Sequence, residues 1–425
     1  MIVVGLLLIL LALLGAPLFA IIAASAMWGF YQAEIDLSIV PLEIYRIAEM
    51  PVLLAIPLFT FAGYLLSESQ APQRLVRLTQ SLIGWLPGGL AIVALGACSI
   101  FTAFTGASGV TIIALGALLY PALREANYPP RFNLGLVTTS GSLGLLFAPS
   151  LPLILYGIVA QQADIGIPVS IEDLFLAGIL PGLLMVLMLS AWSIWVNRHH
   201  RRKFSSFSHK EVVSSLRDAI WEIPLPFVVL GGIYSGYFAV SEAAAVTALY
   251  VIVVEVLILR EVSFRHLPEV MRQSMIMVGG ILLILGVSLA SANYMIDIGA
   301  PTRLFQFIQE HVSDRLTFLI LLNIFLLVLG ALLDIFSALV LVVPLILPVA
   351  VGYGVHPIHL GIIFLANMQL GYLTPPVGIN LFISSYRFKK PITEIYSATW
   401  PFLLILMLCV LLITYIPELS LVFLP

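Results

Sequence analysis

Charged side chains are scarce along this chain, and their scarcity indicates the solvent in which it folds. Only 10% of its 425 residues are Asp, Glu, Lys or Arg, whereas 61% are hydrophobic and the mean hydropathy is +1.11. An ordinary soluble domain has about 25% charged residues. Apolar runs of about 20 residues, each long enough to cross about 30 Å of hydrocarbon as a helix, recur from end to end. The composition predicts an all-α polytopic membrane protein.

Cysteine is also rare, and alternating polarity and excess positive charge are missing. The two cysteines, Cys98 and Cys409, both lie in apolar runs, so neither a disulfide framework nor a metal cluster is expected. Continuous apolar runs exclude a β-barrel, and a net charge of −3 gives no reason to expect nucleic acid. The first run, 2–30, has no Lys or Arg before it and is too long for a signal-peptide core, so we expect a retained helix.

The basic residues indicate which loops lie in the cytoplasm, because short loops rich in Lys and Arg are retained there. Six of the nineteen fall in the linker 197–217, which we place in the cytoplasm. The loops 160–173 and 351–360 contain no Lys or Arg, so we place them outside. Arg303 and Arg315 are exceptions, since this topology puts them outside as well.

The chain resembles an internal duplication at an offset of 227 residues. Pro121 falls on Pro348, Leu143 and Gly144 on Leu370 and Gly371, and Pro149 on Pro376. The charge markers invert between the copies, because the loop with Arg124 and Arg131 matches the uncharged loop 351–360. Inverted-topology repeats are typical of secondary transporters, which bind substrate and ions near the midplane.

Each copy contains a region that cannot cross the membrane once. Basic residues flank 88–123 on both sides, so this region must enter and return as a re-entrant helical hairpin. Its tip lies in FTAFTGASGVT, residues 101–111, and the matching hairpin 316–350 has its tip near 330–337. Irregular backbone at membrane depth survives only where protein, water or ligand satisfies its polar groups.

Beside each hairpin lies a helix that we expect to be broken, over 132–157 and 358–384. Proline removes an amide and clashes with the preceding turn, and these spans contain Pro149, Pro152, Pro375 and Pro376. Carbonyl groups freed at such breaks suit Na⁺, and helix N-termini suit carboxylates. Gly and Pro can instead serve only close packing in membranes, but two symmetric pairs of breaks favour a binding site.

Three acids lie in or near the spans. An acid within a span is a functional-site hypothesis by default, so we expect Asp334 at the second tip to bind an ion or substrate, with helix capping as the alternative. Glu242 opens a span, where a carboxylate suits the helix dipole. Glu255, close to Arg260, is expected at a solvated helix end.

These motifs resemble a known family. Eight segments carry the resemblance, in order: IPLFTFAGYLL, GWLPGGLA, FTAFTGASGVT, FAPSLPLILYG, FLAGILPGLL, SEAAAVTALY, GALLD and LTPPVGINLF. From about residue 5 to 420, the chain is similar to the large membrane subunit of tripartite ATP-independent periplasmic (TRAP) transporters, the DctM-like family. The resemblance implies a sodium-driven importer of the bacterial inner membrane with an elevator mechanism. It implies two partners, a small four-helix DctQ-like membrane subunit and a periplasmic DctP-like binding protein that delivers an organic anion, usually a carboxylate.

The resemblance also implies site residues. The sodium ligands would be Thr105, Gly106, Ser108, Gly141 and Gly144 in the first copy, and Leu333, Asp334, Ser337, Gly371 and Thr374 in the second. The substrate would lie between the tips, at Ser108, Ser150, Asp334 and Thr374.

The expected organisation is as follows. The first repeat, 1–196, has scaffold helices 1–66, arm 67–87, hairpin 88–123, broken helix 132–157 and helix 174–196; the cytoplasmic linker 197–217 and connecting helix 218–240 follow; the second repeat, 241–425, has scaffold helices 241–296, arm 297–315, hairpin 316–350, broken helix 358–384 and helix 397–416.

Other classes of protein fit less well. An intramembrane enzyme needs a catalytic set inside the bilayer, and the seven histidines all lie in loops or at helix ends. A structural membrane-assembly protein would need the symmetric breaks to serve packing alone. A stand-alone sodium- or proton-coupled anion transporter of the same design, without a binding protein, differs from the first interpretation only through the family resemblance.

Overall fold

The computed structural model describes residues 2–86, 88–163, 165–198 and 208–424, and every regular element among them is a helix. Part of the basic linker, 199–207, lies outside the described residues. The elements of the first half are α1 (Ile2–Leu13), α2 (Leu18–Gln32), α3 (Ile39–Ala48), η1 (Pro51–Leu54), α4 (Ala55–Glu68), α5 (Ala71–Ile83), α6 (Gly89–Thr105), α7 (Ser108–Glu125), α8 (Pro130–Ser140), η2 (Leu143–Leu146), α9 (Leu151–Gln162) and α10 (Ile171–Asn197). Those of the second half are α11 (His209–Asp218), α12 (Pro224–Tyr234), α13 (Val240–Ile252), η3 (Val253–Ile258), α14 (Leu267–Asp297), α15 (Ala300–His311), α16 (Arg315–Leu332), α17 (Ile335–Gly352), α18 (Pro357–Gly371), α19 (Ile379–Phe388), α20 (Ile392–Tyr415) and α21 (Glu418–Leu421).

Seven helices in the described part of the chain are long and apolar enough to cross a membrane. A further pair, 130–146 with 151–162, passes the same test but is bent by 41°. These features confirm the predicted all-α polytopic membrane protein.

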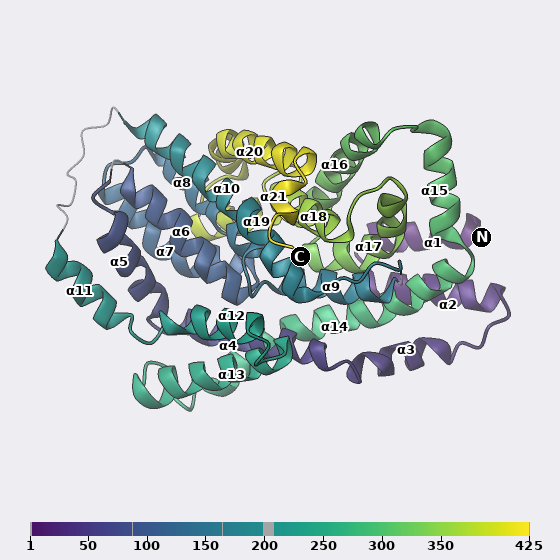
Figure 1. The fold of residues 1–425 in the computed structure, drawn as a ribbon, viewed down its shortest axis with the longest axis horizontal. Coiled ribbons are helices and arrows are strands. Elements are labelled where there is room, and N and C mark those ends of the chain that lie inside the picture. The colour runs from purple at the N-terminus through teal and green to yellow at the C-terminus, as the bar shows by residue number, and fades with distance from the viewer. Residues whose placement is uncertain (1, 87, 164, 199–207, 425) are drawn as a thin grey trace.

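Five helices form a frame along one side of the molecule. Figure 1 shows α3, α4, α13 and α14 along its lower edge, with α2 at the right. Helix α4 packs against α13 and α14, and α14 also contacts α2 and α3. The connection into the second half is shorter than a membrane span, because its helix, α12, covers only Pro224–Tyr234 of the region 218–240.

The two halves present the same order of elements above this frame. An arm helix (α5 or α15) leads into a helical pair (α6 and α7, or α16 and α17), then a broken helix (α8 and α9, or α18 and α19), then a long helix (α10 or α20). In Figure 1 the first pair lies at the left and the second at the right. The matching order is consistent with inverted repeats.

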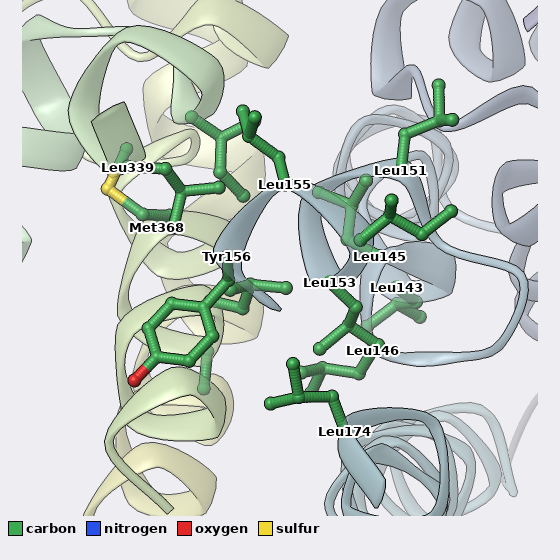
Figure 2. Packing of buried hydrophobic residues seen from close by; sticks show 14 of the residues in the cluster. Leu143, Leu145, Leu146, Leu151, Leu153, Leu155, Tyr156, Leu174, Leu339 and Met368 are labelled. Atoms are coloured by element: carbon green, nitrogen blue, oxygen red, sulfur yellow. The ribbon is translucent and has the colours of Figure 1, made fainter. Parts of the chain in front are cut away.

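The core joins the two halves around α9. Figure 2 shows α9 between leucines of η2 and α10 on one side and Leu339 of α17 and Met368 of α18 on the other. The Tyr156 hydroxyl donates a hydrogen bond to the Pro357 carbonyl oxygen at 2.5 Å. Because lipid is as apolar as leucine, close packing and hydrogen bonds hold such helices together, rather than exclusion of water.

Candidate functional site

The first hairpin turns at a two-residue break. Helix α6 ends at Thr105, Gly106 has a left-handed φ of +64°, Ala107 is extended, and α7 begins at Ser108. A Cβ atom at Gly106 would lie 2.4 Å from Leu151 Cδ1. Glycine is therefore favoured here both by the positive φ and by the close approach of α9.

Hydroxyl groups connect this hairpin to the neighbouring broken helix. The Thr102 hydroxyl donates to the Gly141 carbonyl oxygen at 2.9 Å and lies 2.7 Å from the Thr111 hydroxyl on α7. A Cβ atom at Gly144 would lie 2.2 Å from the Ser99 carbonyl oxygen. The structure thus brings Gly141 and Gly144 against the first tip, through two threonines that the sequence did not indicate.

Thr105 and Ser108 are the two hydroxyl side chains that flank the turn of the first hairpin. Both are buried, and the Thr105 hydroxyl has no hydrogen-bond partner among the described residues. Buried polar groups are almost always paired with protein, water or a bound ion. Thr105 is consequently the side-chain oxygen of the first tip that most needs a ligand.

The second hairpin turns at Leu333 and Asp334, where Asp334 caps α17. Its Oδ1 accepts hydrogen bonds from the amides of Phe336 and Ser337, both at 3.0 Å, and its Oδ2 accepts one from the Ser337 hydroxyl at 2.5 Å. The capping role is therefore present. Ion or substrate binding by the remaining lone pairs stays a prediction.

Backbone contacts hold the second tip against its broken helix. The Ile335 amide donates to the Tyr372 hydroxyl oxygen at 2.9 Å, and the Gly378 amide donates to the Ala331 carbonyl oxygen at 3.2 Å. A Cβ atom at Gly371 would lie 2.5 Å from Gly330 Cα. Tyr372 was missed by the sequence analysis, and it has no symmetric counterpart because the 227-residue offset places Leu145 at its position.

Two of the four predicted substrate residues, Ser150 and Thr374, form hydrogen bonds within their own helix breaks. The Ser150 hydroxyl donates to the Leu145 carbonyl oxygen at 2.5 Å, and the Thr374 hydroxyl donates to the Leu370 carbonyl oxygen at 2.9 Å. No predicted substrate residue lines any of four cavities among the described residues, which have volumes of about 220 to 670 Å³. The substrate position between the tips stays a prediction.

The broken helices are interrupted where their prolines lie. The first is non-helical or 3₁₀ between Ser140 and Leu151, and the second between Gly371 and Ile379. The peptide bonds before Pro149 and Pro376 are both cis. Four helices, α7, α9, α17 and α19, begin at the tips and breaks, so four partially positive N-termini lie in this part of the molecule.

The oxygen atoms at the tips are ligands that suit a hard cation. No group of three or more His, Cys, Asp or Glu side chains that could hold a metal ion occurs in the described part of the chain. The tips and breaks offer hydroxyl, carbonyl and one carboxylate oxygen, which are hard ligands rather than the imidazole and thiolate that transition metals prefer.

The structure confirms the predicted position of one of the other two acids and contradicts that of the second. Glu242 accepts a hydrogen bond from the Ala239 amide at 2.9 Å at the start of α13, which confirms the prediction of a helix-end carboxylate. The prediction for Glu255 is wrong, because this residue is fully buried and faces Arg74. His359, expected at a helix end, lies on the first turn of α18 and is also fully buried.

The comparisons with known proteins agree on a family. Residues 3–419 match the model of the tripartite ATP-independent periplasmic transporter, DctM component. The C4-dicarboxylate TRAP transporter large permease DctM of Rhodobacter capsulatus is 33% identical over 98% of this chain and 96% of its own length. The isethionate TRAP transporter permease DctMQ of Oleidesulfovibrio alaskensis is 32% identical over 96% of this chain, which spans 62% of that longer protein.

A solved structure shares the fold. The YdaH transporter of Alcanivorax borkumensis superposes with a TM-score of 0.62 over 88% of this chain and 86% of its own, at 13% identity. The matched family consists of transporter permeases rather than enzymes, as the sequence predicted. The chain therefore belongs to the DctM family, the large permease component of tripartite ATP-independent periplasmic transporters.

Proposed function

We propose that this chain carries out sodium-coupled secondary active import of a small organic anion. The observation that supports this best is the pair of helix breaks, each packed against a hairpin. The first sodium ion would be held by Thr105, Gly106, Ser108, Gly141 and Gly144. The second would be held by Leu333, Asp334, Ser337, Gly371 and Thr374.

The substrate would be an organic acid held without a basic side chain. Neither hairpin nor broken span, over 88–123, 140–157, 316–350 and 367–384, contains Lys or Arg. Helix N-termini and bound sodium ions would then supply the positive charge. The relatives named for C4-dicarboxylate, isethionate and 2,3-diketo-L-gulonate support an organic acid as the substrate class.

An elevator motion would carry the hairpins past the frame. The close approach of α4 to the first tip supports a gliding contact, since a Cβ atom at Gly63 would lie 2.6 Å from Thr105 Cα. A small residue at a helix interface lets the two backbones approach closely. The hairpins and broken helices would form the moving part, with α5 and α15 as its arms.

The chain would act in the bacterial inner membrane with two partners, a small four-helix DctQ-like subunit and a periplasmic DctP-like binding protein. Membership of a tripartite transporter family supports this assembly. The alternative is a stand-alone sodium- or proton-coupled anion transporter of the same inverted-repeat design.

Reconstitution separates these functions. Proteoliposomes containing the chain and its small subunit, with an inward sodium gradient, would be given radiolabelled dicarboxylates, sulfonates and sugar acids, with or without the binding protein. We expect uptake of one class, only when the binding protein is present. Uptake of free substrate at the same rate without that protein would support the stand-alone alternative.

A further inference from the structure

A cluster of four charged side chains lies away from the hairpin tips. Arg74 of α5 contacts Glu222 before α12, Glu255 in η3, and Glu261 in the loop after η3. Arg74 Nε lies 2.6 Å from Glu222 Oε1, and Arg74 Nη1 pairs with Glu261. Both Glu255 oxygens lie 3.4 Å from Arg74 Nη2. The basic linker 197–217 precedes Glu222, and Arg260 and Arg265 adjoin Glu261, so the positive-inside rule predicts that these segments lie near the cytoplasmic side.

The cluster contains too many carboxylates for its one cation. The side chains of Arg74, Glu222, Glu255 and Glu261 are 12%, 5%, 1% and 15% exposed. If all ionised, three carboxylates would face one guanidinium in a site largely closed to water. Buried charge without a partner is costly, so such a group takes up a proton instead.

Arg77 and Arg217 line the same cavity as Arg74 but pair with none of the three carboxylates. Arg77 pairs with Asp218, and Arg260 donates to the Leu257 carbonyl oxygen. His266 lies 3.4 Å from Glu68, and both of these side chains are nearly half exposed. The Tyr250 hydroxyl donates to the Trp221 carbonyl oxygen. The Gln70 amide donates to Glu261 at 2.8 Å but adds no charge. Within the described residues, Arg74 is therefore the only cation paired with these carboxylates.

Geometry selects Glu255 as the carboxyl that holds the proton. It is the most buried of the three acids and the farthest from Arg74, whose nearer contacts are with Glu222 and Glu261. In addition, Glu222 Oε2 is buried without a hydrogen-bond donor.

The local backbone creates this approach of two acids. Helix α13 continues as the π-helical turn η3, and Arg260 then adopts a left-handed φ of +55°. The chain folds back so that the Glu261 amide donates to the Glu255 carbonyl oxygen at 2.9 Å. π-Helical turns inside helices are frequent at functional sites.

We propose that this cluster is a proton-binding site, with Glu255 as the protonated group, that ties the arm helix α5 to the frame. Helix α5 packs against the first hairpin through α6, whereas η3 extends α13, which packs against α4. Loss of the proton places a second uncompensated charge in the cluster and weakens this tie. Cytoplasmic pH would then control how firmly the first arm is held.

Carbodiimide labelling tests the proton directly and without transport. Dicyclohexylcarbodiimide reacts with protonated carboxyl groups in apolar surroundings, and peptide mass spectrometry identifies the modified residue. For the full chain in liposomes between pH 6 and 9, we expect Glu255 to be labelled at low pH and at least fivefold less at high pH. Labelling that misses Glu255 at every pH, or labelling of Glu255 that does not change with pH, would overturn the proposal.

Thermal unfolding of two variants supplies a second readout. The amide of Glu255→Gln imitates the protonated acid, so its melting temperature should fall less than that of the wild type between pH 6 and 9. Asp218→Asn, in the exposed pair with Arg77, should retain the wild-type pH profile. Equal pH profiles for wild type and Glu255→Gln would contradict the proposal. Neither measurement depends on sodium-coupled uptake, so its failure is distinguishable from failure of the proposed function.

Discussion

Asp334 carries a negative charge into the second tip, and one substitution separates its two roles. Asn caps a helix about as well as Asp, so Asp334→Asn should keep α17 and the melting temperature while removing the charge. We expect sodium-dependent uptake to fall at least tenfold, measured as the initial rate in proteoliposomes at equal protein content.

A matched control is available on the preceding helix. Asp314 caps α16 through the Thr317 amide at 2.8 Å, away from the tip. Asp314→Asn should leave uptake unchanged. Full activity of Asp334→Asn would assign that carboxylate to capping alone.

Thr102 is the second informative residue. In Thr102→Val the Gly141 carbonyl oxygen loses its donor and Thr111 loses its neighbour, and a buried group left unpaired costs about 1–3 kcal/mol. We expect a lower melting temperature and a severalfold higher sodium concentration for half-maximal uptake. Thr247→Val, which removes only a bond to Ala243 in the same helix, should change neither clearly; equal effects of the two variants would refute a link between Thr102 and the site.

Single residues were predictable from the sequence only where their chemistry is local. Asp334 and Glu242 could be found because an acid at a helix start inside an apolar run is informative by itself. Thr102 and Tyr372 could not, because their hydrogen bonds to Gly141 and Ile335 depend on how separate helices are rotated against each other.

Among elements, the glycines at the breaks set how closely hairpin and broken helix approach. In Gly144→Ala and Gly371→Ala the new Cβ would lie 2.2 Å and 2.5 Å from backbone atoms of the facing hairpin. Backbone cannot move aside as a flexible side chain can, and overpacking costs about 1–3 kcal/mol. Both variants should unfold at lower temperature and lose uptake.

Gly280 provides the control for these two substitutions. It lies in α14 with nothing within 4 Å of an added Cβ atom. Alanine in a helix interior is more favourable than glycine, so Gly280→Ala should be neutral or slightly stabilising. Tolerance of alanine at Gly144 and Gly371 alike would show that the hairpins do not depend on this close contact.

The sequence predicted where the helices break, but it did not predict every long-range contact between them. Proline and glycine act on their own backbone, so the interruptions near Pro149 and Pro376 followed from local chemistry. Glu255 was misjudged because its nearness to Arg260 in sequence indicated a solvated helix end. The fold instead turns the chain back at Arg260 and buries Glu255 against α5, which is a long-range contact.

For the whole molecule, the arrangement of the two halves follows from charge and repeat spacing, while the ligand does not. Basic loops and the 227-residue offset indicated inverted repeats because they act over the whole chain. The proposed sites would use backbone carbonyls and helix N-termini, which every sequence has, so the particular organic acid cannot be predicted from these residues.

Sodium coupling of import can be tested by measuring which ion gradient drives uptake. Proteoliposomes with the chain, its small subunit and its binding protein loaded with bound substrate would receive an inward gradient of either sodium ions or protons, at a clamped membrane potential. We predict accumulation against the substrate gradient with sodium alone, and none with protons alone. Accumulation driven by the proton gradient in the absence of sodium would contradict the account.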